Sequence, residues 1–260
     1  MSTATAPQPS STSPLNADPA RFATEGYCIT RDVLGATDLA ATNAALARLM
    51  SSTTVRPEHL VEPHAGADPF WLELCRHPKI LAAVSKVLGD DFVLLMTHLI
   101  VKPAHDGQSV PWHQDEPTWP AVRGADIVTV WLAIDDADCG NGCMRVIPRT
   151  QDGHHAMPMV HNDAENSLFD FRVEVTPEIV AHQVPVELTA GSLSIHDGHI
   201  LHGSEGNTSA RRRAAYTMRY GRTATTSIDT KKHWVPIYVV AGEMPAHGEF
   251  RDLRPGMPIA

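Results

Sequence analysis

From residue 92 onward the chain consists of short apolar runs, and this pattern limits the folds that it can adopt. Gly, Pro, Asn and Asp gather between the runs, at 104–109, 138–142, 189–191 and 205–210. Apolar runs bounded by such residues are typical of β-strands. Strands are therefore predicted at 92–102, 127–135, 143–148, 184–188, 192–196, 199–204 and 214–220.

The first third of the chain carries helical patterns instead. Residues 37–50 have an apolar stripe and begin with Thr37, a residue type that can cap a helix. Residues 78–88 begin with a proline, which suits a first helical turn, and are followed by Gly89, which suits a C-terminal end. Helices followed by many strands predict an α+β, mainly β chain, with a sandwich or jelly-roll core and flanking N-terminal helices.

Length and composition restrict the organisation further. A chain of 260 residues with 43% hydrophobic content can form one globular domain with a sizeable core. The net charge of −9, and the lack of a basic tract beyond 211–213, argue against a nucleic-acid partner. No apolar run approaches a membrane span, and the Ser/Thr/Pro-rich start lacks the pattern of a signal peptide. We expect a disordered tail over 1–16, one domain over 17–260, no membrane partner and a cytoplasmic location.

The four cysteines are expected to be free thiols. None of their spacings is the two-residue spacing typical of zinc sites. Cys139 and Cys143 lie four positions apart near a Gly-Asn-Gly turn. In a reducing compartment such thiols stay reduced.

The segment Trp112-His113-Gln114-Asp115 contains the most informative polar pair. Side chains alternate along an extended strand, so His113 and Asp115 are predicted to point to the same face. An imidazole beside a carboxylate provides two of the three ligands of a 2-His-1-carboxylate triad. Such a triad leaves positions on iron(II) open for other ligands.

The same pattern also arises by chance. With 15 His and 18 Asp in 260 residues, random placement gives roughly one such pair. A second copy does occur, at His161-Asn162-Asp163. It lies in a poorly patterned segment, whereas metal ligands are held better by rigid strands than by loops. Context therefore favours His113 and Asp115.

A third ligand should come from a distant strand that closes the same barrel. His196, His199 and His202 are the candidates, and spacing alone does not decide among them. Asp197-Gly198 is typical of a turn, so His196 belongs to the strand before it. His199 and His202 have opposite parity on the next strand, so both should not face inward. His202 shares its face with Ser204, whereas His196 and His199 fit groups at the rim or behind the ligands.

Together these segments resemble the phytanoyl-CoA dioxygenase family, over roughly residues 20–222. The matching pieces are Leu99-Ile100-Val101-Lys102-Pro103, Trp112–Asp115, Ile127–Ile134, Asn141–Pro148, His202-Gly203-Ser204 with Asn207 and Ser209, and Arg213 with Arg219-Tyr220. Each piece is weak alone, but the combination is specific. The resemblance implies an iron(II)- and 2-oxoglutarate-dependent oxygenase with a double-stranded β-helix, or jelly roll.

The resemblance also implies the site residues. The family's metal ligands are the His-x-Asp pair and a distal His before Gly-Ser, which match His113, Asp115 and His202. An arginine eleven residues after the distal His holds the far carboxylate of 2-oxoglutarate, and Arg213 stands at that position. The planar fork of arginine suits two-point binding of a carboxylate.

Two further residues are expected near 2-oxoglutarate, Ser204 and Trp131, by the same resemblance. On the strand at 127–135, Trp131 shares a face with Thr129 and Ala133, whereas the opposite face is uniformly apolar. The mixed face suits a ligand cavity. A buried structural tryptophan is the alternative.

The expected activity is hydroxylation of an unactivated C–H bond in a small molecule. It is coupled to decarboxylation of 2-oxoglutarate to succinate and CO₂, with Fe(II) as cofactor and O₂ as second cosubstrate. Related halogenases replace the carboxylate of the metal pair with a small residue, so Asp115 argues against halogenation. Desaturation or epoxidation at the same site, a catalytically silent binding protein, and a zinc hydrolase are the alternatives.

The sequence does not specify the substrate or the oligomeric state. Residues 150–183 form a polar connection too long for an ordinary loop, and such connections are often lids or binding loops. The candidate pocket residues flank the metal strand or lie in this connection: Trp119, Met144, His155, Phe169 and Phe171. Nothing marks a CoA ester as the substrate.

Overall fold

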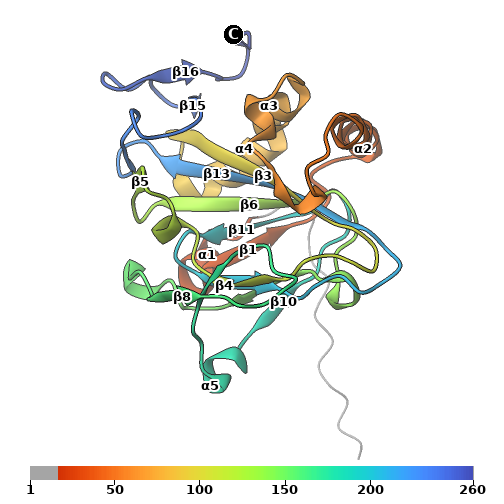
Figure 1. Ribbon diagram of the computed structural model, residues 1–260. Coiled ribbons are helices and arrows are strands. Elements are labelled where there is room, and N and C mark those ends of the chain that lie inside the picture. Colours follow the sequence, from red (N-terminus) through yellow and green to blue (C-terminus); the bar gives the residue numbers. More distant parts are fainter. Residues whose placement is uncertain (1–16, 260) are drawn as a thin grey trace, which may run out of the picture.

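The computed structural model describes residues 17–259, and the expected tail over 1–16 lies outside the described residues. Two facing sheets form its centre (Figure 1). The larger sheet contains, in spatial order, β1 (Tyr27–Thr30), β11 (Leu193–Asp197), β6 (Ile127–Ala133), β13 (Arg213–Arg222), β3 (Phe92–Lys102), β15 (Ile237–Ala241) and β16 (Phe250–Asp252), with β2 (Leu60–Val61) also paired to β3. The smaller sheet contains β10 (Val184–Val186), β7 (Met144–Ile147), β12 (Leu201–Ser204) and β4 (Val110–His113).

Each of the seven predicted strand segments contains a strand, and β3 has the predicted bounds. The sequence patterns did not identify the C-terminal strands β15 and β16, which extend the larger sheet. They also missed two small ribbons. These are β5 (Val122–Arg123) with β14 (Ser227–Ile228), and β8 (Met159–His161) with β9 (Phe171–Val173).

The helices lie mainly on one face of the larger sheet, with the smaller sheet on the other side (Figure 1). They are α1 (Pro19–Glu25), α2 (Ala36–Ser51), α3 (Phe70–Cys75), α4 (Pro78–Leu88) and α5 (Pro177–Val180). Short 3-10 helices occupy Pro57–His59, Pro63–Ala65, Glu116–Thr118, Cys139–Asn141 and Asp152–His154. Within residues 17–259, no helix has the length and apolar character needed to cross a bilayer.

The structure confirms the predicted bounds of one helix and corrects the predicted N-terminal cap of the other. α4 has the predicted bounds, and Gly89 ends it with a positive φ of 82°, which glycine adopts without strain. The predicted cap Thr37 is wrong, because it lies inside α2. Gly35 is the N-cap, and its N–H donates to the Asp38 carboxylate at 3.3 Å.

The long connection over 150–183 has more structure than its weak periodicity indicated. It contains the β8–β9 ribbon and α5. Its backbone is tied to the segment before β4, because the Ser109 N–H donates to the Asn166 carbonyl and the Leu168 N–H to the Ser109 carbonyl. The connection is thereby held beside the strand that carries His113.

The side chains of β6 alternate between the apolar core and a cavity on the opposite face of the sheet. Val128, Val130 and Leu132 of β6 pack with the helices in the largest apolar cluster. Thr129 and Trp131, on the opposite face, line a cavity between the two sheets. This arrangement confirms the predicted division of faces on this strand.

Leu132 provides a test of this division, because its side chain is fully buried in the helix-packed cluster. We expect Leu132→Ala to lower the free energy of unfolding by about 2–5 kcal/mol, since it removes buried methyl groups and leaves a cavity. Val55→Ala is the control, because Val55 is 50% exposed and its change should stay within about 0.5 kcal/mol. Urea denaturation followed by circular dichroism measures both, and equal effects would contradict the assignment of the core.

Candidate active site

Register between β4 and β12 brings two distant histidines together. His113, the last residue of β4, is directly opposite His202 of β12, and their ring centres are 4.0 Å apart. Asp115 lies two residues beyond His113, in the turn that leads into the 3-10 helix Glu116–Thr118. One ligand atom from each of the three residues lies within 4.8 Å of the others.

The backbone fixes which nitrogen of each histidine faces this cluster. His113 Nδ1 lies 2.9 Å from the Pro111 carbonyl oxygen, and His202 Nδ1 lies 3.1 Å from that of Ile200. A carbonyl only accepts, so both Nδ1 atoms carry hydrogen and both Nε2 atoms keep a free lone pair. Hydrogen bonds of this kind orient the ligand histidines of metal sites.

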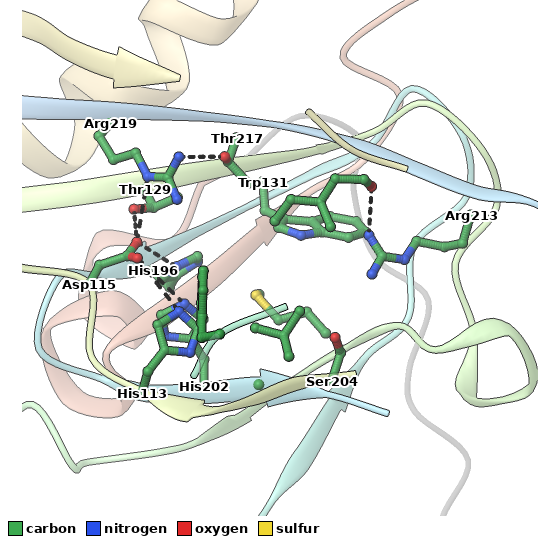
Figure 2. A pocket seen from close by; sticks show the side chains of 15 residues that line it. His113, Asp115, Thr129, Trp131, His196, His202, Ser204, Arg213, Thr217 and Arg219 are labelled. Atoms are coloured by element: carbon green, nitrogen blue, oxygen red, sulfur yellow. Dashed lines mark hydrogen bonds and ion pairs between the residues drawn. The ribbon is translucent and has the colours of Figure 1, made fainter. Parts of the chain in front are cut away.

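The two oxygens of the Asp115 carboxylate have different surroundings. Oδ1 lies 3.7 Å from Nε2 of His113 and 3.9 Å from Nε2 of His202. Oδ2 accepts a hydrogen bond from the Thr129 hydroxyl at 2.6 Å and lies 3.7 Å from Arg219 Nε. Hence Oδ1 is available to a ligand, while Oδ2 is held by the opposite sheet, as Figure 2 shows.

Protonation states suit the binding of a cation. Burial alone would raise the pKa of Asp115, but the neighbouring Arg219 guanidinium holds that pKa well below its usual range. Burial, reinforced by His202, lowers the pKa of His113 to about 3. Burial, reinforced by His196, lowers the pKa of His202 to about 4. At neutral pH the cluster therefore has one negative carboxylate and two neutral imidazoles, which are the forms that bind metals.

A second polar group lies at the far end of the cavity (Figure 2). Arg213 is 1% exposed and lies over the Trp131 ring, 5.3 Å from its centre. Its Nε and Nη1 donate to the carbonyls of Gly142 and Ile100, both at 3.2 Å. Burial lowers the pKa of Arg213 to about 10.

A buried lysine accompanies this arginine. Lys102 is opposite Arg213 on the neighbouring strand, and its Nζ donates to the Ser204 hydroxyl at 2.7 Å and to the Glu205 carbonyl. Burial and the adjacent Arg213 hold the pKa of Lys102 well below its usual range. Among the described residues, neither cation forms an ion pair with a carboxylate. Because an unpaired buried charge is costly, this end of the cavity favours an anion.

The cavity joins the two polar groups. Its lining comprises Ile100, Val110, His113, Asp115, Thr129, Trp131, Met144, Phe169, His196, His202, Gly203, Ser204, Arg213, Thr217 and Arg219. All six residues expected to hold the metal or 2-oxoglutarate are therefore in one cavity. Figure 2 shows Arg213 at the side remote from His113 and Asp115.

The candidate pocket residues divide into two groups. Met144 and Phe169 line the cavity, and Phe169 meets the His113 ring edge to face at 5.0 Å. Phe171 does not line it, because it stacks behind Phe169 at 5.0 Å. Trp119 also lies elsewhere, because the turn after Asp115 carries it into a separate apolar cluster. His155 is exposed, and its backbone carbonyl accepts from Gln114.

The competing histidines lie outside the cluster. His196 lines the cavity, with Nε2 at 3.7 Å from Asp115 Oδ2, and no residue in the described part of the chain forms a hydrogen bond with either ring nitrogen. His199 is in a turn and lies 3.2 Å from Glu116. The second pair, His161 and Asp163, is on the surface, with side chains 71% and 93% exposed.

Gln114, between the two residues of the pair, has a role that sequence reasoning missed. Its Nε2 donates to the carbonyls of His199 at 2.7 Å and His155 at 3.1 Å, and its Oε1 accepts from the Met157 N–H at 2.7 Å. It thereby fastens the turn before β12 and the start of the long connection to the metal strand. No local pattern marks this role, since its three partners are 41 to 85 residues away.

A sequence model of the phytanoyl-CoA dioxygenase family matches residues 22–215. The chain belongs to this family. The predicted jelly roll and the predicted enzyme class, a 2-oxoglutarate-dependent dioxygenase that uses Fe(II), are thereby confirmed. The assignment of individual ligands stays a prediction.

Known relatives and structures agree with this membership. L-proline trans-4-hydroxylase from Streptomyces griseoviridis is 27% identical over 199 residues, which cover 66% of this chain and 74% of that protein. The chain spans only about half the length of several other curated relatives, between 51% and 57%.

Two solved structures have the same fold. The non-heme monooxygenase ThoJ in its apo form has a TM-score of 0.73 and 26% identity, over 92% of this chain and 88% of that one. The epimerase SnoN, in complex with Fe³⁺, alpha-ketoglutarate and nogalamycin RO, has a TM-score of 0.67 and 21% identity, over 93% of both chains.

His98 of β3, beside the site, is a buried histidine from which we expect acid sensitivity of the fold. Its Nε2 lies 2.8 Å from the Glu58 carbonyl oxygen, and burial together with Arg219 lowers its pKa to about 3. The unfolded chain takes up this proton near pH 6.5, so stability is full above that pH and falls as the pH drops.

We expect His98 to cost the metal-free protein about 2 kcal/mol of unfolding free energy as the pH falls from 7 to 5. His98→Gln should reduce the slope of the unfolding free energy against pH by an amount that corresponds to about one bound proton. Urea unfolding at several pH values, with a chelator present, measures the slopes. Equal slopes for the two proteins would show that His98 takes up its proton as readily in the folded protein as in the unfolded chain, which would contradict the lowered pKa.

Proposed function

We propose that this chain is an iron(II)- and 2-oxoglutarate-dependent hydroxylase of a small molecule, with His113, Asp115 and His202 as its metal ligands. The observation that carries the proposal is the convergence of two unprotonated Nε2 atoms and one carboxylate oxygen on one side of a cavity. This donor set fits iron(II) in a facial triad, in which the remaining positions serve cosubstrates.

The opposite sheet would prepare Asp115 for this role. Oδ2 accepts a hydrogen bond from Thr129 and lies close to the Arg219 guanidinium, so the carboxylate would bind the metal through Oδ1 alone. Arg219 is itself oriented by its hydrogen bond to Thr217 at 2.7 Å. A single-oxygen ligand leaves more positions free for 2-oxoglutarate than a two-oxygen ligand would.

Arg213 would bind the far carboxylate of 2-oxoglutarate, while the keto acid end reaches the metal. The buried guanidinium of Arg213, which forms no ion pair with a carboxylate among the described residues, supports this orientation, and Lys102 Nζ donates to the Ser204 hydroxyl. Trp131 would provide a flat wall between the two ends. When bound, iron(II) and 2-oxoglutarate would allow O₂ to act as the oxidant: one oxygen atom would enter succinate as CO₂ leaves, and the other would enter the substrate as a hydroxyl group.

The substrate would enter beside Phe169, because this residue lines the cavity and contacts His113. Phe169 comes from the long connection, so this segment would shape the substrate's side of the cavity. The likeness to an L-proline hydroxylase supports hydroxylation over desaturation or epoxidation, and product mass would separate these outcomes.

The two histidine–aspartate pairs provide a matched test of the metal site. His113→Ala should reduce both iron(II) binding and 2-oxoglutarate-dependent succinate formation to background, since it removes one of three ligands. His161→Ala is the control, because it makes the same change in the exposed pair and should leave both measurements unaltered. Iron retained by the His113 variant at wild-type affinity would overturn the assignment.

Arg213 and Arg211 allow a similar comparison for the cosubstrate. Arg213→Gln should raise the KM for 2-oxoglutarate about 10- to 100-fold, because hydrogen bonds to a charged group contribute roughly 1.5–3 kcal/mol. Arg211→Gln should change it little, since Arg211 is half exposed and pairs with Asp138 on the surface. Initial rates at varied 2-oxoglutarate concentration measure both effects. An unchanged KM in the Arg213 variant would place the carboxylate elsewhere.

A further inference from the structure

A second group of ligand-type side chains lies outside the cavity. It comprises Cys139, Cys143 and Glu187, called here the thiol site. One ligand atom from each lies within 4.8 Å of the others, and all the chain's cysteines are free. Cys143 is 1% exposed, whereas Cys139 and Glu187 are exposed, so an ion from solvent can reach the group.

The backbone holds the three residues in place without an ion. The Cys139 N–H donates to Glu187 Oε1 at 3.0 Å, which fixes the carboxylate beside the thiols. Two backbone hydrogen bonds, at 2.8 and 2.9 Å, join Ala137 to Leu188 and so connect the two segments. The Cys143 N–H closes the intervening turn onto the Asp138 carbonyl at 3.0 Å. A site built in this way needs little rearrangement to bind a ligand.

We propose that the thiol site binds a thiophilic divalent cation, represented by Zn²⁺, through two thiolates and one carboxylate. Zinc takes sulfur and carboxylate oxygen as ligands, and cysteines separated by two to four residues are typical of its sites. The three-residue spacing of Cys139 and Cys143 falls within this range, although the two-residue form is absent from the sequence. The proposal does not depend on the proposed function.

Binding would exchange protons for the cation. Cysteine binds a metal as the thiolate, whereas an ordinary cysteine thiol is mostly protonated at neutral pH. The cation must therefore displace the thiol protons, and affinity should increase with pH.

The bound ion would stabilise the turn that contacts Arg213 at one end of the cavity. Gly142, which lies between the two cysteines in the sequence, accepts a hydrogen bond from Arg213 Nε through its carbonyl. Met144, which follows Cys143, lines the cavity. Fastening this turn to Glu187 would therefore stabilise the position of Arg213, and the ion would have a structural role.

The absorption spectrum of cobalt(II) distinguishes binding at the thiol site from binding at the His-Asp-His cluster. Of these two sites, only the thiol site would give the strong near-ultraviolet charge-transfer absorption of cobalt bound to thiolate. Full-length protein, reduced and free of metal, is titrated with Co²⁺ and then with Zn²⁺. We expect a thiolate band that Zn²⁺ abolishes. The band should persist in His113→Ala and in Cys28→Ser, which removes a thiol from the distant core.

Three variants of the thiol site complete the experiment. Cys139→Ser with Cys143→Ser should abolish the band, and Glu187→Gln should weaken zinc binding about 10-fold or more. Cys139→Ser alone changes an exposed side chain, so it should keep the fold and still lose most of the band. Absence of the band in reduced wild-type protein, or its survival in the double variant, would overturn the proposal.

Discussion

The pairing of β4 with β12 is the constraint on which the site depends. These two strands of the smaller sheet are far apart in sequence, yet their register sets His113 directly against His202. A slip of one residue would turn one of these side chains to the other face of the sheet. The larger sheet then completes the site from across the cavity, because β6 provides Thr129 and β13 provides Arg219. Gln114 ties the surrounding loops to the same strand.

Charge is distributed unevenly along the cavity, and this asymmetry gives the two ends different chemistry. Asp115 has Arg219 as a partner and keeps one oxygen free, so its end favours a cation. At the other end, Arg213 and Lys102 are buried on neighbouring strands, and within residues 17–259 neither forms an ion pair with a carboxylate, which is unfavourable for stability until an anion binds. A molecule with a metal-chelating end and a distant carboxylate matches both ends, and 2-oxoglutarate has that shape and charge.

Sequence patterns predicted the parts of the fold that depend on local chemistry. The bounds of β3 and α4 and the two faces of β6 follow from apolar periodicity and from Gly89. The site was less accessible to such reasoning. Local spacing left three histidines as candidates. The face shared with Ser204 favoured His202 and the resemblance chose it, whereas its register with β4 is a long-range property that no local pattern shows. Asp115 reaches the cluster from a turn rather than from a strand, and that turn also carries Trp119 away from the cavity.

The most direct test of the account is the visible absorption spectrum of the iron(II)-loaded protein, recorded without oxygen as 2-oxoglutarate is added. A keto acid that chelates iron(II) gives a metal-to-ligand charge-transfer band, which requires at least two free positions on the metal. The account predicts such a band, saturating at about one equivalent of 2-oxoglutarate per bound iron. Iron that binds tightly while 2-oxoglutarate leaves its spectrum unchanged would contradict it.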